Sequence, residues 1–238
     1  MMEERDTRIG GAAVAAAILA LGLIIGGYLL GNGLVRARHA DRAVTMRGLA
    51  ERNVTADLAT WTIAYSAQGS ELAPLQAQMD RNTQTITNFF KGFGFQPDEL
   101  SVGGVNVSQY TNSNGVPNVT IRQKLQLRTT KVMEARRAFA RQFDLVRQGV
   151  ALEEGSGMAY SFTKLNAVKP AMIAEATRDA RAGAEQFAKD SGASVGAIKQ
   201  ATQGYFSVGA RDGDNAGSGS DSPFQKVRVV TTIDFYLD

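Results

Sequence analysis

The residues that could carry out catalysis are few, and the composition excludes several kinds of chemistry. The chain of 238 residues contains no cysteine and a single histidine, His39. Without cysteine, a thiolate nucleophile, a disulfide and a cysteine-ligated zinc or iron–sulfur site are all excluded. A Ser-His-Asp triad or a histidine-based metal site would have to use His39, which follows a long apolar segment. We therefore predict a protein that is not an enzyme and that has no catalytic residues, cofactor or metal site.

An acidic, glycine-rich run near the C-terminus has the residue types of a calcium loop. It contains Asp212, Asp214 and Asn215. Ala216 and Pro223 occupy positions at which an EF-hand needs further oxygen ligands. We therefore interpret this run as a solvated loop.

A second acidic cluster, Glu153 and Glu154, comes directly before the sequence Gly-Ser-Gly. Adjacent residues of a strand point to opposite faces, so the two carboxylates are not expected to act as a pair. The glycine-rich sequence lacks the lysine of a phosphate-binding loop, so a phosphate cradle is not expected either.

The overall charge also limits the class of partner. The chain has 26 Lys and Arg against 23 Asp and Glu, a formal net charge of +3. No cluster of basic residues with interleaved aromatic residues occurs, and we therefore expect no nucleic-acid partner. The hydrophobic fraction of 44% and the charged fraction of 21% are typical of a folded globular protein.

The apolar residues are concentrated near the N-terminus. Residues 9–30 contain no charged side chain. As a helix they would rise about 33 Å, enough for a bilayer core of about 30 Å. A cleaved signal peptide is the alternative, but its apolar region usually spans only about 7–15 residues. We predict an uncleaved transmembrane anchor over 9–30, with the lipid bilayer as its partner.

The side of the membrane on which the remaining chain lies is less clear from the flanking charges. Basic residues after the span would hold the C-terminal part in the cytoplasm, whereas long domains translocate largely regardless of charge. Small residues recur at a spacing of four along the span, as in helices that pack closely against each other. These are Ala12, Ala16, Ala20, Gly22, Gly26, Gly27 and Gly31.

The remaining chain alternates between the periodicities of strands and helices. Strands are predicted over 44–48, where Gly48 ends the first of them, and over 54–67, 100–110, 118–130, 149–163, 197–208 and 225–237. Helices are predicted over 71–92, with Ser70 as N-cap, and over 131–147 and 167–190.

Particular side chains are expected to form the core. Trp61 lies on an alternating apolar strand face and is interpreted as a core residue. The second helix is predicted to bury Val132, Ala135, Phe139, Phe143 and Val146, and the third to bury Met172, Ala176, Ala180, Ala184 and Phe187.

These elements predict an α+β fold with helices packed on antiparallel sheet, in the order β-β-α-β-β-α-β-α-β-β. No linker long enough to split the folded part occurs. We divide the chain into an N-terminal tail over 1–8, the transmembrane anchor over 9–30, a basic juxtamembrane linker over 31–42 and one domain over 43–238.

Several motifs of this domain resemble the SIMPL-domain family. Residues 44–48 (VTMRG) and 56–60 (ADLAT) are similar to the family's opening, and residues 93–100 (FGFQPDEL) to the passage before its middle hairpin. Residues 179–188 (DARAGAEQFA) with 192–196 (GASVG) resemble its C-terminal signature. Ala56 and Gly183 depart from the proline and lysine that the family usually has there. The resemblance covers about residues 43–237.

The resemblance implies a bacterial cell-envelope protein with no established reaction and no catalytic residues to transfer. It favours a single-pass protein of the cytoplasmic (inner) membrane whose C-terminal domain is periplasmic or extracellular. It also implies self-assembly into a homo-oligomer, an envelope protein or cell-wall partner, and a role in tolerance of oxidative or envelope stress. The alternative function is a chaperone-like module that binds peptides or cell-wall fragments through residues 111–117 and 209–222.

Overall fold

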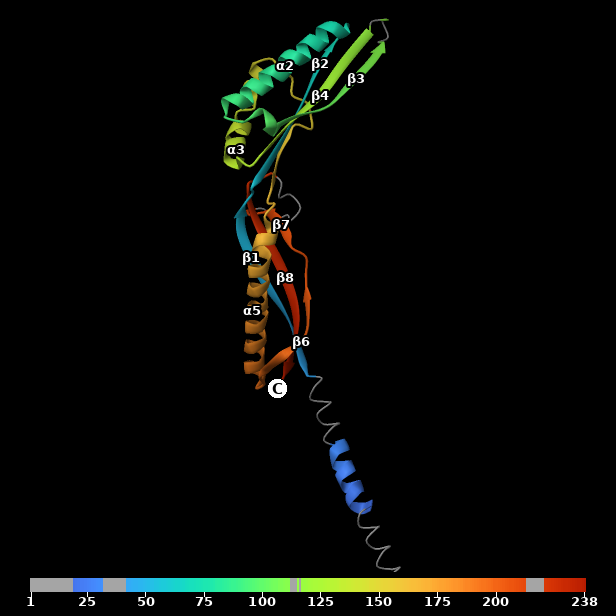
Figure 1. The fold of residues 1–238 in the computed structure, drawn as a ribbon, viewed down its shortest axis with the longest axis vertical. Helices are drawn as coiled ribbons and strands as arrows, with labels where there is room; N and C mark the ends of the chain where they lie inside the picture. The colour runs from blue at the N-terminus through green and yellow to red at the C-terminus, as the bar shows by residue number, and fades with distance from the viewer. Residues whose placement is uncertain (1–18, 32–41, 112–114, 116, 213–220) are drawn as a thin grey trace, which may run out of the picture. The chain divides into compact units, whose positions relative to one another are not determined.

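The computed structural model describes residues 19–31, 42–111, 115, 117–212 and 221–238 (Figure 1). Residues 19–31 form a helix. The elements that follow are β1 (Ala43–Thr55), β2 (Leu58–Gly69), α2 (Leu72–Gly92), the 3-10 helix η1 (Pro97–Glu99), β3 (Leu100–Thr111), β4 (Pro117–Thr129), α3 (Val132–Ala140), α4 (Phe143–Arg147), β5 (Gly157–Ser161), α5 (Leu165–Ser191), β6 (Val195–Gln203), β7 (Ser207–Ala210) and β8 (Phe224–Leu237).

The chain divides into two compact units. The first unit draws on Met1–Leu49, Glu175–Gly204 and Val230–Asp238, and the second on Ala50–Ala174 and Tyr205–Val229. The α+β class and the antiparallel pairing are confirmed in both units. The single domain over 43–238 stays a prediction.

The second unit is built on a four-stranded antiparallel sheet in the order β3-β4-β2-β5. The helix α2 packs on β2 and β4, and α3 packs on β2. The alternation predicted for the strand 118–130 is confirmed, since its apolar side chains are buried against this helix layer while Arg122 and Lys124 on the other face are exposed. The buried residues of β4 on the helix side are Val119, Ile121, Leu125 and Leu127.

The core of the first unit is smaller. It joins Val44 of β1, Ala180 and Ala184 of α5, and Ile233 and Phe235 of β8. Alanines at a spacing of four let the backbone of α5 approach the sheet closely. The strand β8 alternates between buried and partly exposed side chains, as the sequence predicts.

Gly48 does not end a strand, and the predicted boundary there is wrong. β1 runs through Gly48 to Thr55. A Cβ atom at Gly48 would lie 1.8 Å from the carbonyl oxygen of Ala176 and 2.6 Å from the backbone nitrogen of Ala180. Glycine is required here because the backbone of α5 occupies the space of a side chain, and not because the strand stops.

Replacing Gly48 by alanine is expected to lower the free energy of unfolding by about 1–3 kcal/mol, because α5 must move away from β1. Gly183→Ala is a matched control, since its Cβ would meet only the Met46 sulfur at 3.8 Å. An alanine inside a helix should raise stability by about 0.5–1 kcal/mol. Chemical denaturation followed by circular dichroism compares the two variants; equal effects would contradict the close packing at Gly48.

Three predictions about helices need correction. The N-cap of α2 is Glu71, without a side-chain cap, in place of Ser70. The helix predicted over 131–147 ends at Ala140 and resumes at Phe143, so Phe143 is 62% exposed and not buried. Phe187 of α5 is 48% exposed, and Ala188 is the buried residue at that end. Both phenylalanines therefore lie outside the packed faces of their helices.

The element order also differs from the predicted one. The region predicted as one strand over 149–163 forms only β5, and that predicted over 197–208 divides into β6 and β7. Val146, predicted to be buried, is 40% exposed.

The predicted anchor is described only in part. The helix over 19–31 lies almost wholly within it, and residues 9–18 lie outside the described residues. Among the residues that the structure describes, no helix combines the length and apolarity needed to cross a membrane.

Candidate functional site

The candidate residues at the acidic run are placed only in part. Asp212 forms an ion pair with its neighbour Arg211 at 2.8 Å, whereas Asp214 and Asn215, like His39, lie outside the described residues. Within the described ranges, no three His, Asp or Glu residues are grouped so that they could hold a metal ion.

Glu153 and Glu154 do not point to opposite faces of a strand, and that expectation is wrong. The segment before β5 is a turn that lies along β2, where the backbone N–H of Glu153 donates to the carbonyl of Ala64 at 2.8 Å. The Ser156 hydroxyl bonds both the N–H and the carbonyl of Ala64. Both glutamates therefore line one shallow pocket of about 280 Å³.

This pocket has mixed charge. Arg122 and Lys124 of β4 share its walls with the two glutamates, and Arg122 Nε lies 3.3 Å from Glu153 Oε1. Asn106 of β3 lines the pocket as well. The arrangement provides donors and acceptors on the outer face of the sheet, which suits a polar ligand.

Trp61 is a core residue, as predicted. Its side chain is fully buried, and its ring contacts those of Phe89, Phe90 and Phe139 edge-on at centroid separations of 6.1, 5.1 and 5.2 Å. Among the described residues its indole N–H has no hydrogen-bond partner. The cluster fixes α2 and α3 against the sheet.

A half-buried carboxylate, Glu99, ties the start of β3 to the end of β4. It accepts hydrogen bonds from the Thr129 hydroxyl, from the N–H of Gln96 at 2.8 Å and from Lys131 Nζ at 3.1 Å. Lys131 also donates to the carbonyl of Gly94 at 2.9 Å. Burial raises the pKa of the Glu99 carboxyl, but these hydrogen bonds outweigh it and hold the pKa below its ordinary value of 4.5.

Glu99→Gln is expected to lower the free energy of unfolding by about 1–2 kcal/mol at neutral pH, because charge-assisted hydrogen bonds are lost. A lowered folded-state pKa stabilises the fold above pH 4.5, and this contribution is lost as the pH falls through the folded pKa. The difference between the variant and the native chain should therefore disappear in acid. Urea denaturation at pH 7 and pH 3, followed by Trp61 fluorescence, measures it.

The control for this prediction is Glu134→Gln, which removes an exposed ion pair with Arg137. It should change stability by less than about 0.5 kcal/mol. A Glu99→Gln effect that persists unchanged at pH 3 would contradict the assignment.

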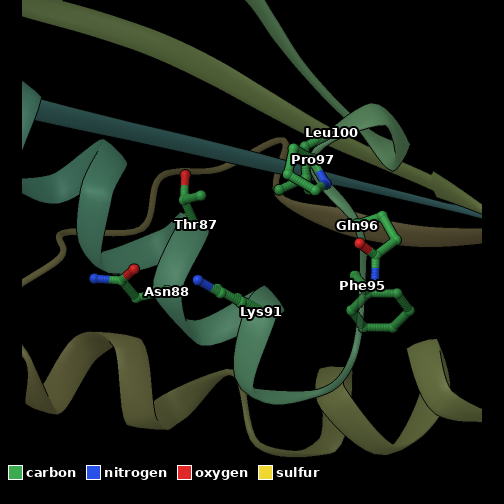
Figure 2. A pocket seen from close by; sticks show the side chains of 7 residues that line it. All are labelled: Thr87, Asn88, Lys91, Phe95, Gln96, Pro97 and Leu100. Atoms are coloured by element: carbon green, nitrogen blue, oxygen red, sulfur yellow. The ribbon is translucent and has the colours of Figure 1, made fainter.

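A second pocket, of about 450 Å³, lies between α2 and the segment that leads into β3 (Figure 2). The lining residues come from the C-terminal part of α2 and from η1 with its flanks, as Figure 2 shows. The lining residues are Thr87, Asn88, Lys91, Phe95, Gln96, Pro97 and Leu100.

The most exposed feature of the second unit is its edge strand β3. β3 pairs on one side with β4, and its other side has no partner strand in the described sheet. Its sequence, LSVGGVNVSQYT, contains neither a charged residue nor proline. A register shift interrupts the pairing between Val102 and Val105, but from Val105 to Thr111 the register is continuous. This stretch offers about 24 Å of unpaired backbone.

β3 also carries an uncovered apolar row. Val102 pairs with Leu125 and Val107 pairs with Ile121, so these valines share the face on which β4 is buried. Because α2 packs on β2 and β4, the row lies beyond its cover, and Val102, Val105 and Val107 are 60%, 58% and 52% exposed. We refer to the unpaired backbone from Val105 to Thr111 together with these three valines as the β3 edge.

The other edge strands carry the features that prevent unwanted pairing. β5 is only five residues long. β6 has two register shifts and carries Lys199. β1 carries Arg47, Glu51 and Arg52. The β3 edge therefore differs from β1 and β6 in having no charge, and from the uncharged β5 and β7 in its length of 12 residues against five and four.

The sequence contained a signal for this surface. Residues 100–110 were predicted as one arm of a hairpin, and their valines are apolar residues of that strand. The position of β3 at the edge depends on long-range pairing, which local pattern does not determine.

The comparisons with known proteins agree with the resemblance in the sequence motifs. The family model described as "SIMPL: Protein of unknown function (DUF541)" matches residues 44–235. None of the curated proteins that were compared matches the chain.

Proposed function

Because the chain belongs to the SIMPL family of proteins of unknown function, we propose a function in assembly rather than catalysis. The protein is a membrane-anchored component of the bacterial cell envelope whose SIMPL domain self-associates. The single observation that carries this proposal is the β3 edge, which combines unpaired backbone with exposed valines.

A second copy of the chain is the occupant that fits the β3 edge. Two β3 strands related by a twofold axis normal to the sheet pair antiparallel, which joins two four-stranded sheets into one of about eight strands. The valine rows of both copies then lie on the same face. The unpaired N–H and C=O groups gain partners, and the apolar row is removed from water.

Because β3 has no charged side chain, a second β3 strand can pair with it without repulsion, whereas a charged partner would find no opposite charge on it. Like charges across such an interface would oppose association, and β3 has none. The small-residue stripe of residues 9–30 supports the same association within the membrane. The exported domain then assembles next to the bilayer. The role that the family resemblance implies for it there is tolerance of oxidative or envelope stress.

Native mass spectrometry of residues 43–238 tests the assembly. We expect a dimer or higher oligomer at micromolar concentration, with a fraction that rises with concentration. A strict monomer at high micromolar concentration would contradict the proposal.

The membrane topology is tested separately. We expect a reporter at the C-terminus that is active only outside the cytoplasm to be active, and a reporter active only in the cytoplasm to be silent. The reverse pattern would contradict the periplasmic location.

The mixed-charge pocket favours a second function, the binding of peptides or cell-wall fragments. Its charges, Arg122 and Lys124 with Glu153 and Glu154, match those of a zwitterionic ligand. Titration with a soluble cell-wall stem peptide should then give saturable binding that Arg122→Ala weakens. Saturable binding without concentration-dependent oligomers would favour this function over assembly.

A further inference from the structure

We propose that the pocket between α2 and η1 binds a carboxylate attached to a small apolar group, as at the C-terminus of a peptide ending in an apolar residue. This inference is independent of the assembly proposed for the β3 edge. It rests on an available cation, on polar side chains that line the same pocket and on the apolar residues that line its other side, all within the second unit (Figure 2).

The cation is Lys91, in the last turn of α2. In the part of the chain that the structure describes, its ammonium has no hydrogen-bond or ion-pair partner. The carbonyls at this helix end do not require it, because the N–H groups of Phe93 and Phe95 donate to the Phe90 carbonyl and that of Gly94 donates to the Lys91 carbonyl. The ammonium is therefore available to a ligand.

The carboxylates of η1 do not compete for Lys91 within the pocket. Neither Asp98 nor Glu99 is among the lining residues, and the oxygens of Glu99 accept from Thr129, Gln96 and Lys131. No acidic residue lines the pocket as described. An anionic ligand thus meets one formal positive charge and no negative one.

Three polar side chains line the pocket together with Lys91. The Gln96 side chain accepts from the N–H of Glu99 in a capping box, which leaves its amide NH₂ free to donate. The amide of Asn88 has no partner among the described residues, and the Thr87 hydroxyl donates to the Thr83 carbonyl and so can only accept. In Figure 2 the Lys91 side chain extends toward Asn88 and away from Gln96, so the ammonium and the Asn88 amide suit the two oxygens of a carboxylate.

The floor of the pocket supplies the apolar contact. Pro97 and Leu100 offer accessible apolar surface, and Phe95, which is 2% exposed, lies in the core behind them. A volume of about 450 Å³ accepts a residue-sized group. A ligand that has only a charge would contact Lys91 but not the apolar residues, and a ligand that has only an apolar body would contact those residues but not Lys91.

Three small probes separate these contributions in saturation-transfer NMR titrations of the full chain in detergent. N-acetyl-leucine carries both groups, N-acetyl-leucinamide lacks the charge, and acetate lacks the apolar body. We expect N-acetyl-leucine to bind roughly tenfold more tightly than either truncated probe, the factor typical of one charge-assisted hydrogen bond. Equal affinity for the acid and its amide, or no binding of the acid, would overturn the proposal.

Lys91→Gln tests the assigned cation, with Lys164→Gln as the matched exposed-lysine control. Lys91→Gln should weaken N-acetyl-leucine roughly tenfold and leave N-acetyl-leucinamide unchanged, a pattern that a damaged fold would not give. Lys164→Gln should change neither. An unchanged affinity of Lys91→Gln for the acid would overturn the role of Lys91, whereas monomeric protein that still binds the acid would overturn only the assembly.

Discussion

Replacing Val107 by lysine is expected to leave residues 43–238 monomeric at concentrations at which the native sequence associates. Val107 is 52% exposed, so the lysine adds no buried charge to the isolated chain. In the antiparallel pair, the two lysines would lie on one face close to the twofold axis. Such like charges cost several kcal/mol, which weakens association by roughly a hundredfold or more.

The matched control is Val146→Lys on α4. Val146 is 40% exposed and lies outside the β3 edge, so the same change of charge should leave association intact. Sedimentation velocity measures the monomer fraction of both variants, and circular dichroism checks that each is folded. If both variants dissociate alike, net charge and not the β3 edge controls assembly.

Replacing Trp61 by alanine is expected to lower the free energy of unfolding by about 3–5 kcal/mol, the largest stability effect in the chain. The fully buried ring contacts three phenylalanines, and its loss leaves a cavity that sheet and helices cannot close. Trp61→Phe should cost much less, because it keeps an aromatic ring and removes the buried indole N–H that has no partner among the described residues.

Urea denaturation followed by circular dichroism measures both Trp61 variants. Phe143→Ala serves as the control, since Phe143 is 62% exposed and should change stability by less than about 1 kcal/mol. A Trp61→Phe loss as large as that of Trp61→Ala would show that ring volume does not explain the effect.

Local pattern predicted the elements whose two faces differ clearly in polarity. In β4 the buried Ile121, Leu125 and Leu127 alternate with more exposed polar residues, and in β8 the buried Val227 and Val229 alternate in the same way. A strand with one face in water and one in the core imposes this alternation on its sequence. Both strands were therefore found with boundaries close to those observed.

Where packing between distant segments decides, the pattern was misleading. Gly48 has the residue type of a strand end, but a helix well over a hundred residues later occupies the space of its side chain. The break between Ala140 and Phe143 leaves Phe143 outside the core, although its spacing continued the helical stripe. Neither effect is visible without the tertiary partner.

The candidate surfaces show the same division. The alternating valines of β3 could be recognised from the sequence, whereas the absence of a covering helix depends on where α2 packs. The two glutamates share one pocket because residues 153–156 form a turn and not a strand. The pocket at Lys91 lies between α2 and η1. Backbone N–H groups occupy the carbonyls at the end of α2, which leaves the Lys91 ammonium available, and this follows only from the three-dimensional structure.

The most direct test of the assembly is the distance between two β3 strands. Because the chain has no cysteine, a single cysteine introduced at Asn106, Ser108 or Tyr110 carries the only spin label on each copy. With the twofold axis close to Val107, antiparallel pairing predicts similar short distances for labels at Asn106 and at Ser108, and a separation along the strands about 14 Å longer for labels at Tyr110. Double electron–electron resonance measures this series; a constant distance, or no dipolar coupling at any of the three positions, would contradict pairing through the β3 edge.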